Sequence, residues 1–410
     1  MAQPIFAEPP AGAVPMDFDP FGMDFRSDPS RFHAMLFAAS PGFITMEGVP
    51  SAFVASYAQV TRVLRDFKAF SSLKPKRMPG MQRVDFFNGL PVMNYSDPPD
   101  HTRRRKVVNP AFTPVRVARI EQEASSHADQ LIEDVLARGT FEAMDELAKP
   151  LSINALLGSF MEIPVEQRHI FLNYIKTLPL LDRLQIDDPK PAAYLAAWEE
   201  GRRFCREQQE LARRGKCSNL IGVIANSAED GAIDDDEMMA MMIVLLIGGF
   251  STVAGAIGVA LMNLARTPGL AARIVAEPEL ADRHLEESLR LDPPVSLVMR
   301  FAAADTEVGG TTIPQGMPVY ALIATACHDP AVFPDPYRFD VDRPNVKDHI
   351  AFGFGMHTCI GNAITRMIVP MVLRKVAARM PSLHIPDDGA IAWDTGTPRA
   401  RHLKALTLAL

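Results

Sequence analysis

A stretch of 28 residues without a charged side chain, residues 238–265, constrains the fold of this chain more than any other feature. A helix that is apolar all round either crosses a membrane or is buried inside a large protein. The stretch contains four glycines together with Ser251, Thr252 and Asn263, and it follows four consecutive acidic residues, which suit a helix N-terminus. A single span in mid-chain would leave the rest of the sequence unexplained. We therefore expect the central helix of a large core and no membrane crossing.

The composition agrees with a large globular protein. Of the 410 residues, 48% are hydrophobic and 22% are charged, and no linker divides the chain into two ordinary domains. The net charge of −7 provides no general basic field, so nucleic acid is not expected as a partner. We expect one catalytic domain over residues 21–410, in a monomer, after an extended arm over residues 1–20.

The N-terminal segment and the cysteines indicate the cellular compartment of the protein. The first twenty residues hold five prolines and no basic residue, whereas a secretory signal needs a positive start and an apolar core. The cysteines are far apart and form no C-x-x-C pair, which favours a reducing compartment without disulfides. They are Cys205, Cys217, Cys327 and Cys359. The sequence therefore predicts a cytoplasmic protein.

Hydrophobic periodicity predicts a mainly helical chain with short strands near both ends. A strand at 52–56 and a helix at 60–67 precede a long irregular connector at 74–97. Further helices are predicted at residues 100–108, 115–138, 141–160, 164–178, 191–214, 217–227, 234–266, 278–291 and from Cys359 to about 380. Strands are predicted at 296–304, 306–313, 318–322 and 403–410.

A glycine-rich segment, residues 351–361, holds Cys359 just before a predicted helix. The glycines leave little side chain over the backbone, so a flat ligand could lie against it. The helix, beginning near Asn362, would direct its unpaired N–H groups toward the sulfur and favour a thiolate, the form that binds metal. A single thiolate without another Cys or His at zinc spacing argues against zinc. It suits a metal that carries most of its own ligands, as haem iron does.

This segment resembles the haem-binding loop of the cytochrome P450 family of haem-thiolate monooxygenases, with the pattern Phe352-Gly353-x-Gly355-x-His357-x-Cys359-x-Gly361. The resemblance extends in family order over about residues 20–410. It implies a mainly α, single-domain fold with a small β region, and haem b (iron protoporphyrin IX) between the central helix and the cysteine-loop helix. Cys359 would bind the iron, and Phe352, Gly353 and Gly361 would contact the cofactor.

Other segments match the family at structural and cofactor positions. Glu287 and Arg290 correspond to a Glu-x-x-Arg motif, which Arg343 would complete as a buried charge network. Four donors would hold the haem propionates through charge-assisted hydrogen bonds. These donors are His101, Arg105, Arg300 and His357.

The central helix departs from the family at one catalytic position. Gly249 and Thr252 match the pattern, and the resemblance implies that Thr252 guides proton delivery. However, Ser251 stands where most members have an acid. A hydroxyl passes a proton along a water chain but is a poor proton reservoir. Oxygen activation would then be slow and leaky, unless another group or water supplies the protons.

The substrate contacts are inferred from position in the sequence, and the resemblance to the family implies the electron donor and its docking face. Mostly apolar residues would line the distal pocket and favour a hydrophobic small molecule. They are Phe86, Phe87, Met93, Val244, Gly248, Val295 and Val298. Because no reductase segment or flavin motif is visible, electrons would come from a ferredoxin-type iron–sulfur protein and its NAD(P)H reductase. Basic residues on two helices would form the docking face: Arg103, Arg104, Lys106, Arg366, Arg374, Lys375 and Arg379.

Several alternatives stay open at this point. A peroxide-dependent or non-oxygenating haem-thiolate enzyme would explain Ser251, and it would turn over with hydrogen peroxide but not with reduced ferredoxin and dioxygen. A haem-binding sensor would bind haem without forming a product. Cys327 beside His328 could suggest a cysteine nucleophile, but neighbouring residues rarely face each other productively, so we interpret both as structural.

Overall fold

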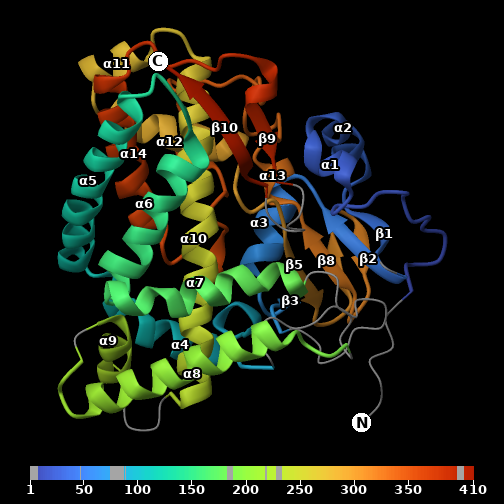
Figure 1. Cartoon of the computed structure of the whole chain (residues 1–410). Coiled ribbons are helices and arrows are strands. Elements are labelled where there is room, and N and C mark those ends of the chain that lie inside the picture. Colours follow the sequence, from blue (N-terminus) through green and yellow to red (C-terminus); the bar gives the residue numbers. More distant parts are fainter. Residues whose placement is uncertain are drawn as a thin grey trace. The chain divides into compact units, whose positions relative to one another are not determined.

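The computed structural model describes residues 8–46, 48–73, 87, 89–181, 188–217, 219–227, 233–394 and 401–410 (Figure 1). Residue contacts divide the chain into two compact units. Unit 1 comprises Met1–Ser72, Ser125–Leu151 and Thr252–Leu410, and unit 2 comprises Leu73–Ala124 and Ser152–Ser251. The predicted site residues are distributed over both units.

Unit 1 contains a five-stranded sheet in the order β1-β2-β8-β5-β3, whose blue and orange strands lie side by side in Figure 1. Its strands are β1 (Gly42–Met46), β2 (Val49–Val54), β3 (Phe70–Ser71), β5 (Val298–Ala302) and β8 (Pro318–Ala321). β2 and β8 pair in parallel, and the other neighbours are antiparallel. β2 and β8 are almost continuous apolar runs because both faces of these strands are covered.

A short hairpin, β6 (Thr306–Val308) and β7 (Thr311–Ile313), corrects one prediction. We expected a single strand over residues 306–313. The chain instead turns at Gly309 and Gly310, whose φ angles of 55° and 81° suit glycine and match a tight two-residue hairpin turn.

A three-stranded sheet, β4-β10-β9, forms the remaining β structure of unit 1. Its strands are β4 (Thr140–Glu142), β9 (Ile391–Trp393) and β10 (Leu403–Ala409). β10 lies between the other two and pairs antiparallel with each, which confirms the strand predicted near the C-terminus.

Unit 1 also contains helices. They are α1 (Met23–Ser27), α2 (Ser30–Ala39), α3 (Tyr57–Arg65), η3 (Met144–Ala148), α11 (Leu270–Ala276), α12 (Leu280–Leu291), α13 (Ile323–Ala326), η7 (Val346–Asp348), η8 (Gly355–His357), α14 (Asn362–Arg379) and η9 (Asp388–Ala390). α14 packs against α11 and α12. The amphipathic α3 begins at Ser56, whose side chain accepts a hydrogen bond from the backbone N–H of Gln59.

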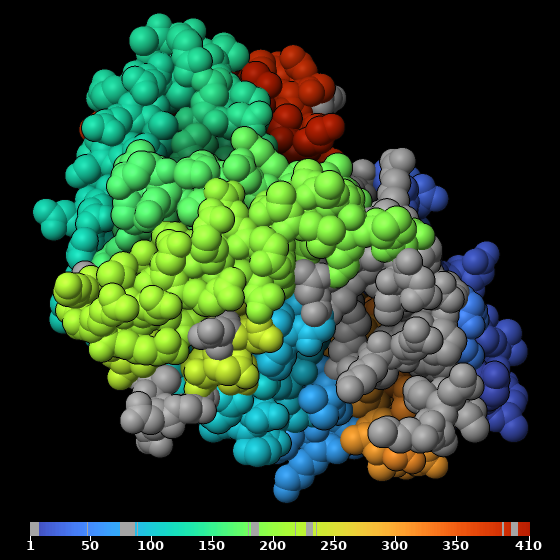
Figure 2. All heavy atoms as spheres, turned by 60° about the horizontal axis from the view of Figure 1, so that its bottom comes forward, coloured from blue at the N-terminus to red at the C-terminus, as the bar shows by residue number. Residues whose placement is uncertain are grey.

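Unit 2 is helical and has its own aromatic core. Its elements are η1 (Met93–Tyr95), α4 (Asp100–Val108), η2 (Asn109–Phe112), η4 (Asn154–Phe160), η5 (Val165–Gln167), α7 (Arg168–Thr177), η6 (Leu178–Leu181), α8 (Ala192–Arg213) and α9 (Leu220–Ser227). α7 and α8 join through the rings of Phe171 and Phe204, 5.4 Å apart, and of Tyr174 and Trp198, 6.1 Å apart. Figure 2 shows α8 and α9, in yellow-green, on one face beside the cyan residues around α4.

Three helices run through both units: α5 (Pro114–Leu136), α6 (Lys149–Ile153) and α10 (Asp235–Arg266). α10 is the helix predicted from the charge-free stretch. By length and composition it could cross a membrane, yet 61% of its most apolar window is buried within the structure. Most residues of 238–246 and 253–264 are buried, as expected for a core helix.

Most predicted helices are confirmed, with local differences. The segment predicted as a helix over 141–160 begins as strand β4 and then alternates α and π turns. The helices α1, α2 and α11 were not predicted from the sequence. The N-terminal arm also packs on unit 1, because Phe18 is buried and the N–H of Met16 donates to the carbonyl of Phe43 at 2.7 Å.

Candidate functional site

The cysteine of the glycine-rich segment is exposed at the end of a closed loop. Cys359 lies between η8 and α14. Its backbone N–H donates to the carbonyl of Phe352 at 2.8 Å, and the side chain of Asn362 donates to the carbonyl of Cys359 at 2.6 Å. Because α14 begins three residues later, its N-terminal end can favour a thiolate.

Glycines give this loop its shape. Gly353 and Gly355 have φ angles of 76° and 75°, a region that other residues rarely adopt. A Cβ atom on Gly355 would lie 2.8 Å from the carbonyl oxygen of Leu64, near the end of α3. A Cβ atom on Gly361 would have the sulfur of Cys359 as its nearest neighbour, at 4.0 Å. The loop can therefore approach α3 closely, and little covers the thiol.

A buried carboxylate that sequence analysis missed connects both sides of the loop. Glu286, on α12, accepts hydrogen bonds from His349 Nε2 at 2.8 Å and from Arg366 at 2.6 and 3.0 Å. His349 Nδ1 accepts from the N–H of Ala351 at 3.1 Å, so its proton lies on Nε2. The Arg366 guanidinium lies 4.5 Å from the ring centre of Phe352. Glu286 thus holds the chain before Cys359 and the helix after it.

The electrostatics of this carboxylate follow from its partners. Burial disfavours the charged form of Glu286, but the hydrogen bonds from His349 and Arg366 outweigh burial and lower the pKa of this carboxyl to about 2. Glu286 is therefore ionised at neutral pH. Two consecutive glutamates on an otherwise buried helix face could have signalled this role, whereas nothing in the sequence singles out His349.

The neighbouring carboxylate forms a second buried network. Arg290 donates two hydrogen bonds to Glu287, at 2.7 and 2.9 Å, and Arg343 donates one at 3.2 Å. Glu287 also accepts from the N–H of Asp340 at 3.0 Å. Glu287 and Arg290 have no exposed surface, and Arg343 is almost fully buried. The three residues predicted to form a charge network thus lie together.

The pair Cys327 and His328 does not form a nucleophilic site. Cys327 is completely buried, and burial raises the pKa of its thiol to about 12. His328 Nδ1 donates to the carbonyl of Ala324 at 2.9 Å. Both side chains are therefore part of the packed core.

The four predicted propionate donors occupy two different units. His101, buried, and Arg105, half-buried, lie on α4 of unit 2. In unit 1, Arg300 is buried on β5 and donates to the carbonyl of Met299 at 2.9 Å. His357 Nε2 lies 3.0 Å from the hydroxyl of Ser72.

Most basic residues of the docking face predicted on α4 and α14 have acidic partners, so their positive charge is paired within the protein. The pairs are Arg103 and Arg104 with Glu237, Arg366 with Glu286, Arg374 with Asp282, Lys375 with Asp129, and Arg379 with Asp129 and Glu133. Arg104 is also buried. Of the predicted set, only Lys106 lacks an ion pair in the described part of the chain. The sequence cannot reveal such pairs, since the acids come from distant segments.

Burial along α10 is interrupted at the predicted catalytic residues. Gly248 is exposed, and no heavy atom lies within 4 Å of the position that a Cβ atom would take there. Gly249 is tightly packed, because its Cβ position lies 2.8 Å from Leu156. Ser251 and Thr252 are half-buried.

The predicted pocket residues divide between the units. In unit 2, Phe87 packs with Val244 in one apolar cluster, and Met93 is buried nearby in the chain on η1. In unit 1, Val295 and Val298 are half-buried, and Val298 pairs with Ala321 in the sheet. Phe86 lies outside the described residues.

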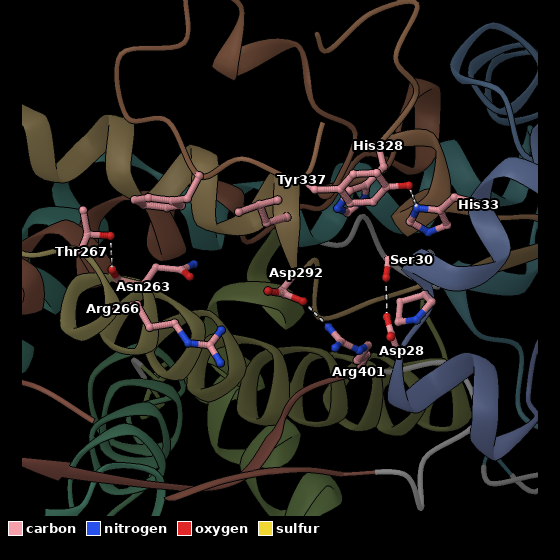
Figure 3. Close-up of a pocket in the computed structure, with 13 residues that line it drawn as sticks. Asp28, Ser30, His33, Asn263, Arg266, Thr267, Asp292, His328, Tyr337 and Arg401 are labelled. Atoms are coloured by element: carbon pink, nitrogen blue, oxygen red, sulfur yellow. Dashed lines mark hydrogen bonds and ion pairs between the residues drawn. The ribbon is translucent and has the colours of Figure 1, made fainter. Parts of the chain in front are cut away.

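A separate cavity of about 340 Å³ in unit 1 contains none of the predicted site residues. Figure 3 shows that its polar side chains largely pair with one another, including Asp292 with Arg401 and Ser30 with Asp28. His33 Nδ1 lies 3.1 Å from the hydroxyl of Tyr337. Burial lowers the pKa of His33 to about 3 and that of His328 to about 4. Both imidazoles are therefore neutral at pH 7.

These neutral histidines predict a stability loss in acid. The unfolded chain regains pKa values near 6.5, so it binds more protons than the folded chain between about pH 6.5 and pH 4. The free energy of unfolding should fall as pH drops through this range, and the slope should be shallower in His33→Gln. Denaturant unfolding at several pH values measures this slope. The exposed His384→Gln variant is the control, and an equal slope in both variants would contradict the prediction.

The contact of Gly355 with α3 predicts a large effect of adding one methyl group. Gly355→Ala combines a positive φ with a clash against the carbonyl of Leu64, and should lower the free energy of unfolding by about 2–4 kcal/mol. Gly316→Ala is the control, since its φ is 82° and no atom lies within 4 Å; it should cost only about 1–2 kcal/mol. Equal losses in denaturant unfolding would mean that the loop does not press on α3.

Comparisons with known proteins agree with this geometry. A family model described as Cytochrome P450 matches residues 43–379. Steroid C26-monooxygenase of Mycobacterium tuberculosis (strain CDC 1551 / Oshkosh) is 32% identical over 303 residues, covering 74% of this chain and 81% of that protein. Cytochrome P450 monooxygenase PikC of Streptomyces venezuelae is 31% identical over 409 residues, covering 98% of this chain and 95% of that protein.

A solved structure gives the same result for the fold. Cytochrome P450 CYP109Q5 from Chondromyces apiculatus superposes with a TM-score of 0.83 at 28% identity, covering 96% of this chain and 97% of that chain. The family model spans well over half of the sequence, including the loop of Cys359. The chain therefore belongs to the cytochrome P450 family and is an oxidoreductase of the monooxygenase class.

Proposed function

We propose that this enzyme binds haem b through the thiolate of Cys359 and inserts one oxygen atom from dioxygen into a hydrophobic small organic substrate. The observation that carries the proposal is the exposed thiol of Cys359, held by a closed, glycine-rich loop before α14. Family membership supports thiolate ligation of haem iron.

The residues of this chain fit such a cofactor. Gly248 leaves open space beside α10, and Gly361 places no side chain near the sulfur of Cys359. We assign further contacts with the cofactor to Phe352 and Gly353. Imidazole and guanidinium groups are suitable donors to two propionate carboxylates. We assign this role to His101, Arg105, Arg300 and His357.

When bound, thiolate-ligated haem supplies reductive oxygen chemistry, in which substrate, dioxygen, two electrons and two protons yield hydroxylated product and water. We propose that a ferredoxin-type iron–sulfur protein and its NAD(P)H reductase deliver the electrons to a monomeric, cytoplasmic enzyme.

The proton route depends on α10. We propose that the hydroxyl of Thr252 orients the protons and that Ser251 passes them from water, since a hydroxyl both donates and accepts. Gly249 lets α10 pack closely against Leu156, because it has no side chain. The missing acid at position 251 is the observation that favours a second candidate, a peroxide-dependent or non-oxygenating haem-thiolate enzyme. A haem-binding sensor remains the other alternative.

A hydrophobic substrate agrees with the apolar side chains at the predicted pocket positions. Phe87 and Val244 form one apolar cluster of unit 2 with Val92 and Ala240, and Gly248 leaves space four residues after Val244. The relative named steroid C26-monooxygenase acts, by its name, on a steroid. We propose an apolar substrate of that general kind.

Absorption spectroscopy tests the proposal. The purified enzyme, reduced with dithionite and exposed to carbon monoxide, should show the strongly red-shifted Soret band of a thiolate-bound haem, and Cys359→Ala should lose it. Cys205 is buried and lies 154 residues before Cys359 in the sequence, so Cys205→Ala is the control and should keep the band. A wild-type enzyme that binds no haem would overturn the proposed function.

A further inference from the structure

We propose that Glu237, a buried carboxylate at the start of α10, is a positioning residue for the cofactor, because it fixes the helix α4 that carries His101 and Arg105. This inference rests on the proposed function, in which these two residues hold the haem propionates. Glu237 acts through α4 and not by touching the cofactor. In the sequence it is one of four consecutive acids before the charge-free stretch, and no role toward the cofactor was predicted for it.

Two neighbouring arginines of α4 converge on the carboxylate of Glu237. Arg103 donates to both of its oxygens, to Oε2 through Nη1 at 2.9 Å and to Oε1 through Nη2. Arg104 donates to Oε1 through Nε at 2.9 Å, and its Nη2 also lies 2.9 Å from Oε1. Guanidinium–carboxylate bonds of this kind are directional as well as strong. Bonds from two adjacent residues therefore fix the position of α4 along α10 and the rotation of α4 about its own axis.

The carboxylate lies where water can hardly replace these bonds. The side chains of Glu237 and Arg104 are each only 8% exposed, whereas that of Arg103 is 37% exposed. Burial opposes ionisation of Glu237, but the hydrogen bonds from Arg103 and Arg104 outweigh burial and hold the pKa of this carboxyl below its ordinary value. Loss of the negative charge would leave the buried guanidinium of Arg104 without the carboxylate that neutralises it. α4 would then have to move for Arg104 to reach water.

The same short helix carries both proposed cofactor donors of unit 2. α4 has nine residues, and Arg104 and Arg105 follow His101 by three and four positions, so the three side chains are neighbours on one side of the helix. A movement of α4 that exposes Arg104 also displaces His101 and Arg105. Charge-assisted hydrogen bonds need short distances, about 2.7–2.9 Å, so this displacement would weaken both contacts with the propionates.

A neighbouring acid of α10 provides a matched control. Asp236 forms a comparable ion pair with Arg202 of α8, at 2.9 Å, one residue before Glu237. This pair joins α10 to a helix that carries no proposed cofactor donor. The side chains of Arg202 and Arg103 are similarly exposed, at 35% and 37%. Glu237→Gln and Asp236→Asn each remove one negative charge, so both change the net charge from −7 to −6.

Haem release tests the inference without substrate, electron donor or turnover. The holoenzyme mixed with excess apomyoglobin should lose haem at least about tenfold faster in Glu237→Gln than in the wild type, as is typical when a group that orients a ligand is removed. Arg103→Gln should show a smaller acceleration, because Arg104 still binds Glu237, and it serves as the test if Glu237→Gln does not fold. Asp236→Asn and Arg202→Gln should release haem at close to the wild-type rate.

A double-mutant cycle separates positioning from a general loss of stability. In a His101→Ala/Arg105→Ala background the donors are absent, so adding Glu237→Gln should change the rate of haem release by less than about twofold. An equal acceleration in both backgrounds, or in Glu237→Gln and Asp236→Asn alike, would overturn the inference. A wild-type enzyme with the thiolate spectrum and a Glu237→Gln variant with the wild-type release rate would reject only the positioning role. Absence of haem from the wild type would instead reject the proposed function.

Discussion

Two adjacent carboxylates on α12 hold the candidate site in place, because each joins segments that lie far apart in the sequence. Glu286 binds His349 and Arg366 on the two sides of the cysteine loop, and Glu287 binds Arg290 and Arg343. Buried charges are costly unless they are paired and hydrogen-bonded, and removal of one partner leaves the other uncompensated. The loop therefore depends on a helix about seventy residues earlier in the chain.

The sequence predicted the long elements and the chemistry-bearing loop, and the reasons are local. The charge-free stretch of α10 and the glycines around Cys359 carry their signal within one segment. The pair Gly309-Gly310 could have predicted a hairpin turn. The residues on both sides have strand character, however, and suggested one continuous strand. α11 was missed because a seven-residue helix provides too little periodicity to recognise.

What the sequence could not predict are the partners of charged side chains. Arg366, Arg374, Lys375 and Arg379 have the pattern of a solvated basic helix face, yet their acids come from α12 and α5. The basic residues of α3 have a similar pattern but no acidic partner in the described structure. Tertiary packing decides which of these cations form ion pairs within the protein. It therefore also decides where unpaired positive charge lies on the surface.

If Glu286 holds the loop of Cys359 in place, the variant Glu286→Gln should change amide hydrogen exchange in that loop. The amides of Ala351 and Cys359 should exchange at least about tenfold faster in the variant, since the bonds to His349 and Phe352 lose their support. The amides of β8, between β2 and β5, should keep their protection. Unchanged exchange at Ala351 and Cys359, or equal acceleration in β8, would contradict the claim.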